Sequence, residues 1–300
     1  MTQLLDSDDT TALVADDELA GHELTRLAPA FLAIAALLAL VAGLDVYAGS
    51  EHTKDFFAWG LSSPVSATLV GAGLIGVVPM LFAASHRVLW EEARIAVVPA
   101  GVLVLGMAGV SVLHREDLTL GGGTIIALAL AWGWLLAMIG LTIFAGVVLL
   151  AQLSEPGLPL ARTSPLPRLV LPAIAVEASA LFGLGLGLLG NPGFWGGLLP
   201  WQVSVLDARA LGVWGLTLGW ALLQALAEDD LHRVQPGLVG ILGIGVLGLA
   251  GLAWHRAEID WATWGAASCV ALLAGLVATG VIGLTLLRLS RTSGEGSSRA

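Results

Sequence analysis

One carboxylate in this sequence stands where an ionisable side chain is costly. Glu177 lies in the segment Ile174-Ala-Val-Glu-Ala-Ser-Ala180, well inside an apolar run. A charge in hydrocarbon costs about 2.5–3.5 kcal/mol on insertion scales, so such a residue is protonated, paired or turned toward water. This pattern is typical of a proton or cation site, or of an anchor for a substrate amine. The alternative is a structural Glu that bonds to a neighbouring helix or reaches the interface.

Two histidines are each followed by an acid three residues later. The two polar clusters consist of His114, Arg115, Asp117, His255, Arg256 and Glu258. Residues three apart share a face if the helix continues, and imidazole beside carboxylate can bind a divalent metal or relay a proton. The alternative is a polar helix end at the water boundary. No cysteine, third histidine or fixed ligand spacing supports a metal, so we predict neither a metal nor a cofactor.

Aromatic residues gather in two segments between apolar runs. Trp59 lies in the segment 56–64, and Trp195 and Trp201 lie in the segment 194–201, each with Gly and Pro. Such segments can line a vestibule or gate. The alternative is an aromatic belt, because Trp favours the headgroup zone of a bilayer.

Small residues recur on two of the apolar runs. Gly183 and Gly187 are four residues apart, and four further glycines fall roughly along one face of the seventh run: Gly237, Gly240, Gly248 and Gly251. Small residues at such spacing let helices approach closely, so these glycines predict tight helix packing.

Several signatures of soluble enzymes and nucleic-acid-binding proteins are absent from the sequence. There is no phosphate-binding Gly-Lys-Ser/Thr loop, no dinucleotide fingerprint, no Gly-x-Ser-x-Gly elbow and no His-Glu-x-x-His motif. No basic patch suits nucleic acid, and we expect no nucleic-acid partner.

The composition favours lipid as the solvent of these groups. Hydrophobic residues make up 57% of the 300 residues and charged residues 12%, with a mean hydropathy of +0.88. About 20 apolar residues cross a bilayer as a helix, whereas a β-barrel alternates with a period of two. The unbroken Leu, Ala, Val and Gly runs therefore predict an all-α membrane bundle of about eight helices.

The apolar runs divide the chain into five parts. The runs fall at 27–48, 65–85, 95–113, 124–152, 169–189, 210–227, 236–254 and 264–287. We expect an acidic tail at 1–26, four helices in 27–153, a Pro- and Ser-rich linker at 154–168, four helices in 169–287 and a disordered tail at 288–300.

The basic residues predict the orientation. Of the 13 Lys and Arg residues, nine fall on the side of the two tails, the linker and the loops after the second and sixth runs, and four fall on the other side. Because positive charge stays inside, both termini are expected in the cytoplasm of a protein in the cell membrane. The acidic start of the chain lacks the basic region of a signal peptide.

The order of features suggests an internal duplication. Gly71 precedes His114 by 43 residues, and Gly212 precedes His255 by 43 residues. Each half runs as helix, aromatic loop, helix, charged loop, helix, His-Arg loop and helix. Two sets of four helices would lie parallel, related by an axis along the membrane normal.

Two strings resemble the signatures of a group of bacterial multi-pass membrane proteins. Pro200-Trp-Gln-Val-Ser-Val-Leu-Asp-Ala-Arg-Ala-Leu-Gly-Val-Trp214 is similar to their Pro-Trp…Thr-Ala-Arg-Ala-Leu-Gly-Ala-Trp pattern, and Phe57-Ala-Trp59 with Ser66-Ala67 is similar to their Phe-Ala-Trp…Thr-Ala pattern. The chain departs at Ser66 and Asp207, where the group has Thr. The resemblance implies the membrane architecture. It carries over no catalytic residue, because the group has no established activity.

Three functions fit these patterns. The first is a transporter or channel for a small solute or ion, because duplicated bundles often bind substrate between their halves; its candidate lining residues are Glu177, Trp132, Trp134, Trp214 and Trp220. The second is a scaffold or accessory subunit, with membrane lipid and a membrane protein or a second copy as partners. The third is an enzyme that acts on lipid through His114 and His255.

Overall fold

The computed structural model describes residues 21–118, 120–121, 125–158 and 160–297. In these ranges eight helices are long and apolar enough to cross a membrane, which confirms the predicted all-α bundle and indicates a multi-pass membrane protein. They are α2 (Leu27–Ala48), α4 (Pro64–Ala84), α5 (Trp90–Leu113), α6 (Ile125–Gln152), α7 (Leu171–Gly190), α9 (Val205–Glu228), α10 (Leu231–Trp254) and α11 (Trp264–Ser297).

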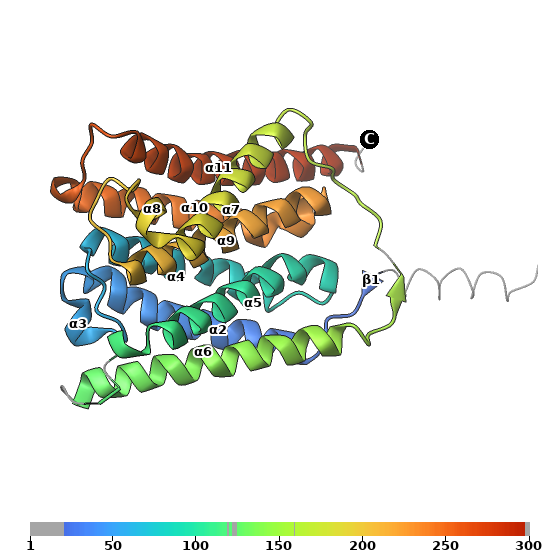
Figure 1. Ribbon diagram of the computed structural model, residues 1–300. Coiled ribbons are helices and arrows are strands. Elements are labelled where there is room, and N and C mark those ends of the chain that lie inside the picture. Colours follow the sequence, from blue (N-terminus) through green and yellow to red (C-terminus); the bar gives the residue numbers. More distant parts are fainter. Residues whose placement is uncertain (1–20, 119, 122–124, 159, 298–300) are drawn as a thin grey trace, which may run out of the picture.

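Short elements mark the two ends of the bundle (Figure 1). We call one the far end; it carries η1 (Ser50–His52), α3 (Thr53–Phe56), η2 (Arg115–Asp117), α8 (Pro192–Gly196) and η3 (Arg256–Glu258). We call the other the tail end, where β1 (Gly21–His22) pairs antiparallel with β2 (Gly157–Leu158). The first 20 residues of the predicted acidic tail lie outside the described residues.

Three helices begin about one turn earlier than the apolar runs indicate. Helices α5, α9 and α10 start at Trp90, Val205 and Leu231. The apolar runs begin later because the first turns of these helices contain charged residues. The Ser204 side chain caps α9 and the Asp230 side chain caps α10, each by accepting backbone N–H groups of the first turn. At the other extreme, α11 continues to Ser297, so residues 288–297 are helical where the sequence suggested an irregular tail.

The long helices pack as antiparallel pairs that also contact one another. Helix α2 packs on α4 and α7 on α9, while α5 packs on α6 and α10 on α11. Two further contacts, α4 on α10 and α5 on α9, join the amino- and carboxy-terminal sets of four. Figure 1 shows α7 lying obliquely to the other long helices.

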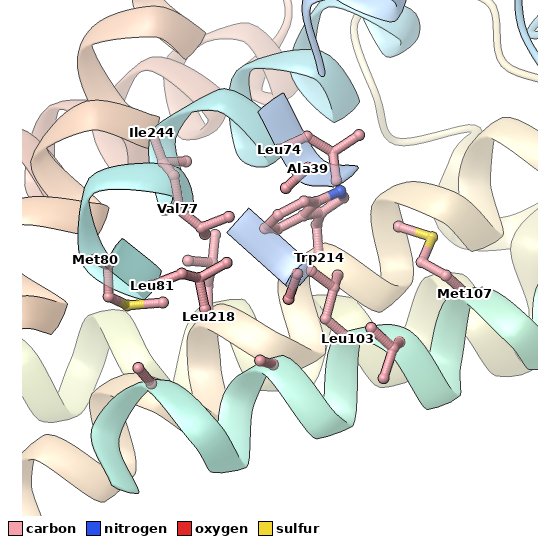
Figure 2. Packing of buried hydrophobic residues seen from close by; sticks show 14 of the residues in the cluster. Ala39, Leu74, Val77, Met80, Leu81, Leu103, Met107, Trp214, Leu218 and Ile244 are labelled. Carbon is pink, nitrogen blue, oxygen red and sulfur yellow. The ribbon is translucent and has the colours of Figure 1, made fainter. Parts of the chain in front are cut away.

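The centre of the bundle is apolar and lies where the two sets of four helices meet. Figure 2 shows Trp214 of α9 among Leu74 and Val77 of α4, with Leu103 of α5 close by. Trp214 is 5% exposed. A Cβ added at Gly73 would lie 2.6 Å from its ring, so glycine there makes room for the indole.

Glycines hold the closest helix contacts, as the sequence predicted, but not always the expected ones. On α10, a Cβ at Gly251 would lie 2.4 Å from Thr68, and one at Gly240 would lie 3.1 Å from Met80. On α7 the close contact is made by Gly185, whose Cβ would lie 2.2 Å from the backbone nitrogen of Leu216. Gly183 faces open space, so the prediction that it packs tightly is wrong.

Candidate functional site

A cleft of about 590 Å³ separates α7 from α11. It exists because α7 packs on α9 and α11 packs on α10, whereas α7 and α11 touch only briefly. Its walls are almost entirely aliphatic, and they include Val170, Ile174, Ala180, Leu238, Leu272 and Leu286. We call this the Glu177 cleft, because Glu177 is its only charged lining residue.

Glu177 is buried, and one of its two carboxylate oxygens has a hydrogen-bond partner among the described residues. Glu177 is 9% exposed, and its Oε2 accepts a hydrogen bond of 3.2 Å from the Thr279 hydroxyl of α11. Its Oε1 is buried without a hydrogen-bond partner. Gly275, one turn before Thr279, makes room for the carboxylate, since a Cβ there would lie 2.5 Å from Oε1. Within the described residues no Lys, Arg or His pairs with Glu177.

The cleft adjoins two smaller hollows. An inner cavity of about 50 Å³ shares Ile174, Leu238 and Thr279 with the cleft. A far cavity of about 110 Å³ shares Trp214, Leu218 and Ile244 with the inner cavity and ends under Trp201. The cleft and the inner cavity thus lie side by side in the tail-end half of the bundle, and the far cavity lies nearer the far end.

Two unpartnered polar groups line the inner cavity. The Thr217 hydroxyl and the Trp214 indole N–H are both buried without a hydrogen-bond partner. Buried polar groups are normally paired, and an unpaired one costs about 1–3 kcal/mol. The surface of the inner cavity is nevertheless wholly apolar, so its neighbours cover both groups and neither faces the open space.

The histidine of each polar cluster already makes contacts with other side chains of the protein. Arg209 of α9 donates to His114 Nε2 over 2.9 Å, so Nε2 is an acceptor and Nδ1–H donates to Asp117, also over 2.9 Å. His255 bonds the Ser50 hydroxyl at 3.1 Å and lies 3.7 Å from Glu258.

The remaining members of the two clusters do not add a metal site. Arg115 and Arg256 are exposed. In the described part of the chain no three His, Cys, Asp or Glu side chains come together as a metal-binding group.

The aromatic segments reach into the bundle. Trp59 is fully buried, with its ring 5.2 Å from that of Trp134 in an edge-to-face contact. Trp201 is 6% exposed, and its indole N–H donates to the Ser66 hydroxyl over 2.9 Å. The Trp195 ring covers Gly187, whose Cβ would lie 2.4 Å away.

The other tryptophans proposed as lining residues divide into buried and exposed pairs. Trp134 and Trp214 are 7% and 5% exposed. Trp132 and Trp220 lie on the outer surface, 46% and 43% exposed. Of these, only Trp214 is placed along the three hollows described above.

Asp207 ties the two sets of helices together at the far end. It is fully buried, and its carboxylate accepts from the backbone N–H groups of Ser62 and Ser63 and from the hydroxyls of Ser62 and Ser204. The segment before α4 and the start of α9 therefore meet in space. They form a polar contact that closes the far end.

A second polar group ties the helices at the tail end. Glu228 of α9 is 4% exposed and pairs with Arg94 of α5 and, at 3.7 Å, with Arg233 of α10. The Arg233 guanidinium also donates to the linker carbonyls of Leu160 and Ala161. These contacts hold the linker on the α9–α10 corner.

Asp230 anchors the same linker. Burial raises the pKa of its carboxyl, but backbone N–H donors outweigh that effect and hold the pKa below its ordinary value of 3.8. The donors are the backbone N–H groups of Thr163, Ser164, His232 and Arg233.

Sequence reasoning found Glu177 but missed its partners. Thr279 and Gly275 lie about 100 residues further along the chain, on a helix whose pairing no local pattern specifies. A Gly and a Thr four residues apart on one apolar run were the available signal, because both then share a helix face.

Comparison of the chain with protein-family models, with curated proteins and with solved structures finds no match.

Proposed function

We propose that this protein is a transporter that binds a small cationic solute in the carboxy-terminal set of helices and moves it between the two sets, with Glu177 as its binding carboxylate. The observation that carries the proposal is the buried, unpartnered Oε1 of Glu177 at the start of three adjoining hollows. A carboxylate kept in a membrane segment marks an ion or substrate pathway more often than a structural contact.

The lining residues that the hollows share support a path rather than an isolated binding site. A solute at Glu177 would next reach the inner cavity beside Thr217 and Trp214, and then the far cavity under Trp201. Trp214 borders both the inner and the far cavity, so its ring stands where the path must open.

Flux measurements in proteoliposomes test the proposal. Radiolabelled rubidium, methylammonium and octylammonium would be offered one at a time, with chloride as an anion control and protein-free liposomes as background. We expect protein-dependent flux of at least one cation and no chloride flux. Glu177→Gln should abolish that flux, whereas Glu51→Gln, at an exposed far-end position, should leave it unchanged.

Two outcomes would reject transport of a cation. One is flux of every cation at the protein-free rate. The other is equal flux through the wild type and Glu177→Gln. A second polypeptide retained on gentle purification, together with either result, would favour the scaffold function.

We also propose that the bundle is a duplicated unit of four helices. The pairing of α2 with α4 corresponds to that of α7 with α9, and the pairing of α5 with α6 corresponds to that of α10 with α11. The two connecting contacts, α4 with α10 and α9 with α5, also correspond under the same exchange. These equivalent pairings support a two-fold relation along the membrane normal.

The tail end is proposed to face the cytoplasm, with the protein in the cell membrane. The excess of arginine on the tails, the linker and the adjoining loops supports this orientation. A cysteine placed at Arg87 should then be shielded from an impermeant maleimide in intact cells, and one placed at Asp260 should be labelled.

A further inference from the structure

The Glu177 cleft opens toward lipid rather than toward water. Val176 and Ile282 line it from α7 and α11 and are 71% and 46% exposed. Both belong to helices that span the membrane, so their exposed faces contact hydrocarbon. A molecule can therefore reach Glu177 sideways from the bilayer.

Glu177 is within reach of the tail-end interface. It lies six residues beyond Leu171, where α7 begins, which corresponds to about 9 Å along the helix axis. The aliphatic wall between Leu286 and Ile174 spans that distance. The cleft thus offers a carboxylate, with an aliphatic wall between that carboxylate and the interface.

The polar groups at the inner end suit an ammonium group. Oε1 has no hydrogen-bond partner among the described residues, and Thr279 donates to Oε2 while keeping lone pairs that can accept a further N–H. Two acceptors on adjoining helices can thus bind one protonated amine. Binding would also supply the counter-charge that a buried carboxylate requires.

The same groups do not suit a calcium ion or a quaternary ammonium. Calcium takes six to eight oxygen ligands, whereas Glu177 and Thr279 are the only side chains with oxygen among the residues that line the cleft. A quaternary ammonium is bound by aromatic faces, and none of these lining residues is aromatic.

We infer that the ligand of this site is a lipophilic primary amine. It enters between α7 and α11 from the bilayer, binds Glu177 and Thr279 through its ammonium group and places its apolar part along the aliphatic wall. The inference rests on the proposed function for its place in a transport path, but the binding event itself can be measured without any flux.

The test is equilibrium binding of tritiated octylamine to the purified protein in lipid nanodiscs, with empty nanodiscs as background. We expect saturable binding of one octylamine per chain. Unlabelled octylamine should compete, whereas octyltrimethylammonium, octanol and methylamine should each compete at least about tenfold less well, a difference of about 1.4 kcal/mol. Each analogue removes one feature: the N–H donors, the charge or the tail.

Two variants localise the site. Glu177→Gln should weaken octylamine binding by at least about tenfold, and Glu51→Gln should not. If Glu177→Gln does not fold, Thr279→Val serves instead, because it keeps the shape and the carboxylate and removes the hydroxyl; it should weaken binding several-fold.

The outcomes separate this inference from the transport proposal. Equal competition by octyltrimethylammonium or octanol, or unchanged binding to both variants, would overturn the amine site. Octylamine binding without flux of any cation would reject transport and leave the amine site standing. Protein-dependent rubidium flux without octylamine binding would reject the amine site and leave the transport proposal standing.

Discussion

At the scale of single residues, the absence of a side chain at Gly275 decides where the Glu177 carboxylate can lie. A Cβ on Gly275 would stand 2.5 Å from Oε1 and 3.0 Å from Cδ, closer than non-bonded atoms approach. Glu177 would have to turn away from Thr279. The two acceptors that we assign to the amine would then separate.

Gly275→Ala should therefore weaken octylamine binding by about tenfold while the helical content stays that of the wild type. Binding in nanodiscs and circular dichroism on the same sample measure the two effects. Gly183→Ala is the matched control, since a Cβ there meets nothing within 4 Å. Wild-type affinity in Gly275→Ala would show that the carboxylate does not bind the amine from this position.

Asp207 is the second residue whose substitution should be severe. Asp207→Ala leaves the backbone N–H groups of Ser62 and of the buried Ser63 without this acceptor. We expect a loss of about 2–5 kcal/mol of stability, seen as a lower midpoint of thermal unfolding in detergent. Asp117→Ala, whose side chain is 54% exposed, should unfold near the wild-type midpoint. Equal midpoints for both variants would contradict the role of Asp207.

The residue scale shows what a sequence can and cannot predict about the site. Glu177 is visible because a carboxylate interrupts an apolar run, which is a local property. Its partner Thr279 and the role of Gly275 depend on which helices lie side by side. The polar clusters at His114 and His255 were visible for the same local reason, and only the structure revealed that Arg209 and Ser50 occupy them.

At the scale of helices, α7 and α9 come closest where glycines face each other. A Cβ on Gly185 would lie 2.2 Å from the Leu216 nitrogen and 2.8 Å from the Gly212 oxygen, so the obstacle is backbone that cannot rotate away. Gly185→Ala should force the helices apart and cost about 1–3 kcal/mol, measured by thermal unfolding. Gly183→Ala, two positions earlier, should cost little. If Gly183→Ala were less stable than Gly185→Ala, α7 would have to be rotated about its axis relative to the arrangement described.

The two glycines also show why helix pairing resists local reasoning. A spacing of four residues singled out Gly183 and Gly187, yet Gly185 makes the contact with α9. Spacing identifies a face, whereas the partner selects which face is used. By contrast, the number of spanning helices follows from composition and length alone, and that part of the fold was predicted correctly.

The linker between the two sets of helices should respond to acid through Asp230. Because the folded pKa of Asp230 lies below its ordinary value of 3.8, its contribution is present above that value and is lost as pH falls through the folded pKa. The wild type should lose stability in this window. Asp230→Asn should be about 1–3 kcal/mol less stable near neutral pH and lose less on acidification.

Unfolding midpoints recorded from about pH 6 to about pH 3 test this prediction, with Asp117→Asn at an exposed position as the control. Wild type and Asp230→Asn with the same slope against pH would show that Asp230 does not carry the response.

At the scale of the whole molecule, polar contacts join the two sets of helices at both ends, and the opening lies at the side. At the tail end, Glu228 of α9 pairs with Arg94 of α5. The far end is held by Asp207 with Ser62 and Ser63, and by Trp201 with Ser66, all of which join the two sets of helices. Toward the tail end, the Glu177 cleft lies open to lipid. A transporter in this state takes its solute from the lipid through the cleft and must separate the far-end contacts to release it at that end.

A cross-link at the far end should therefore stop transport without stopping binding. Ser62 Oγ lies 3.1 Å from the Ser204 nitrogen, so cysteines at both positions are close enough to pair. Cys269→Ser is the background, because Cys269 is the only cysteine of the chain. Oxidation of the double variant should bring cation flux to the protein-free level and leave octylamine binding at Glu177 unchanged, and reduction should restore the flux. The Ser62→Cys single variant should show the same cation flux before and after oxidation. Undiminished flux through a fully cross-linked protein would mean that the far-end contacts need not part, and the path would then have to leave the bundle sideways through the lipid-facing cleft.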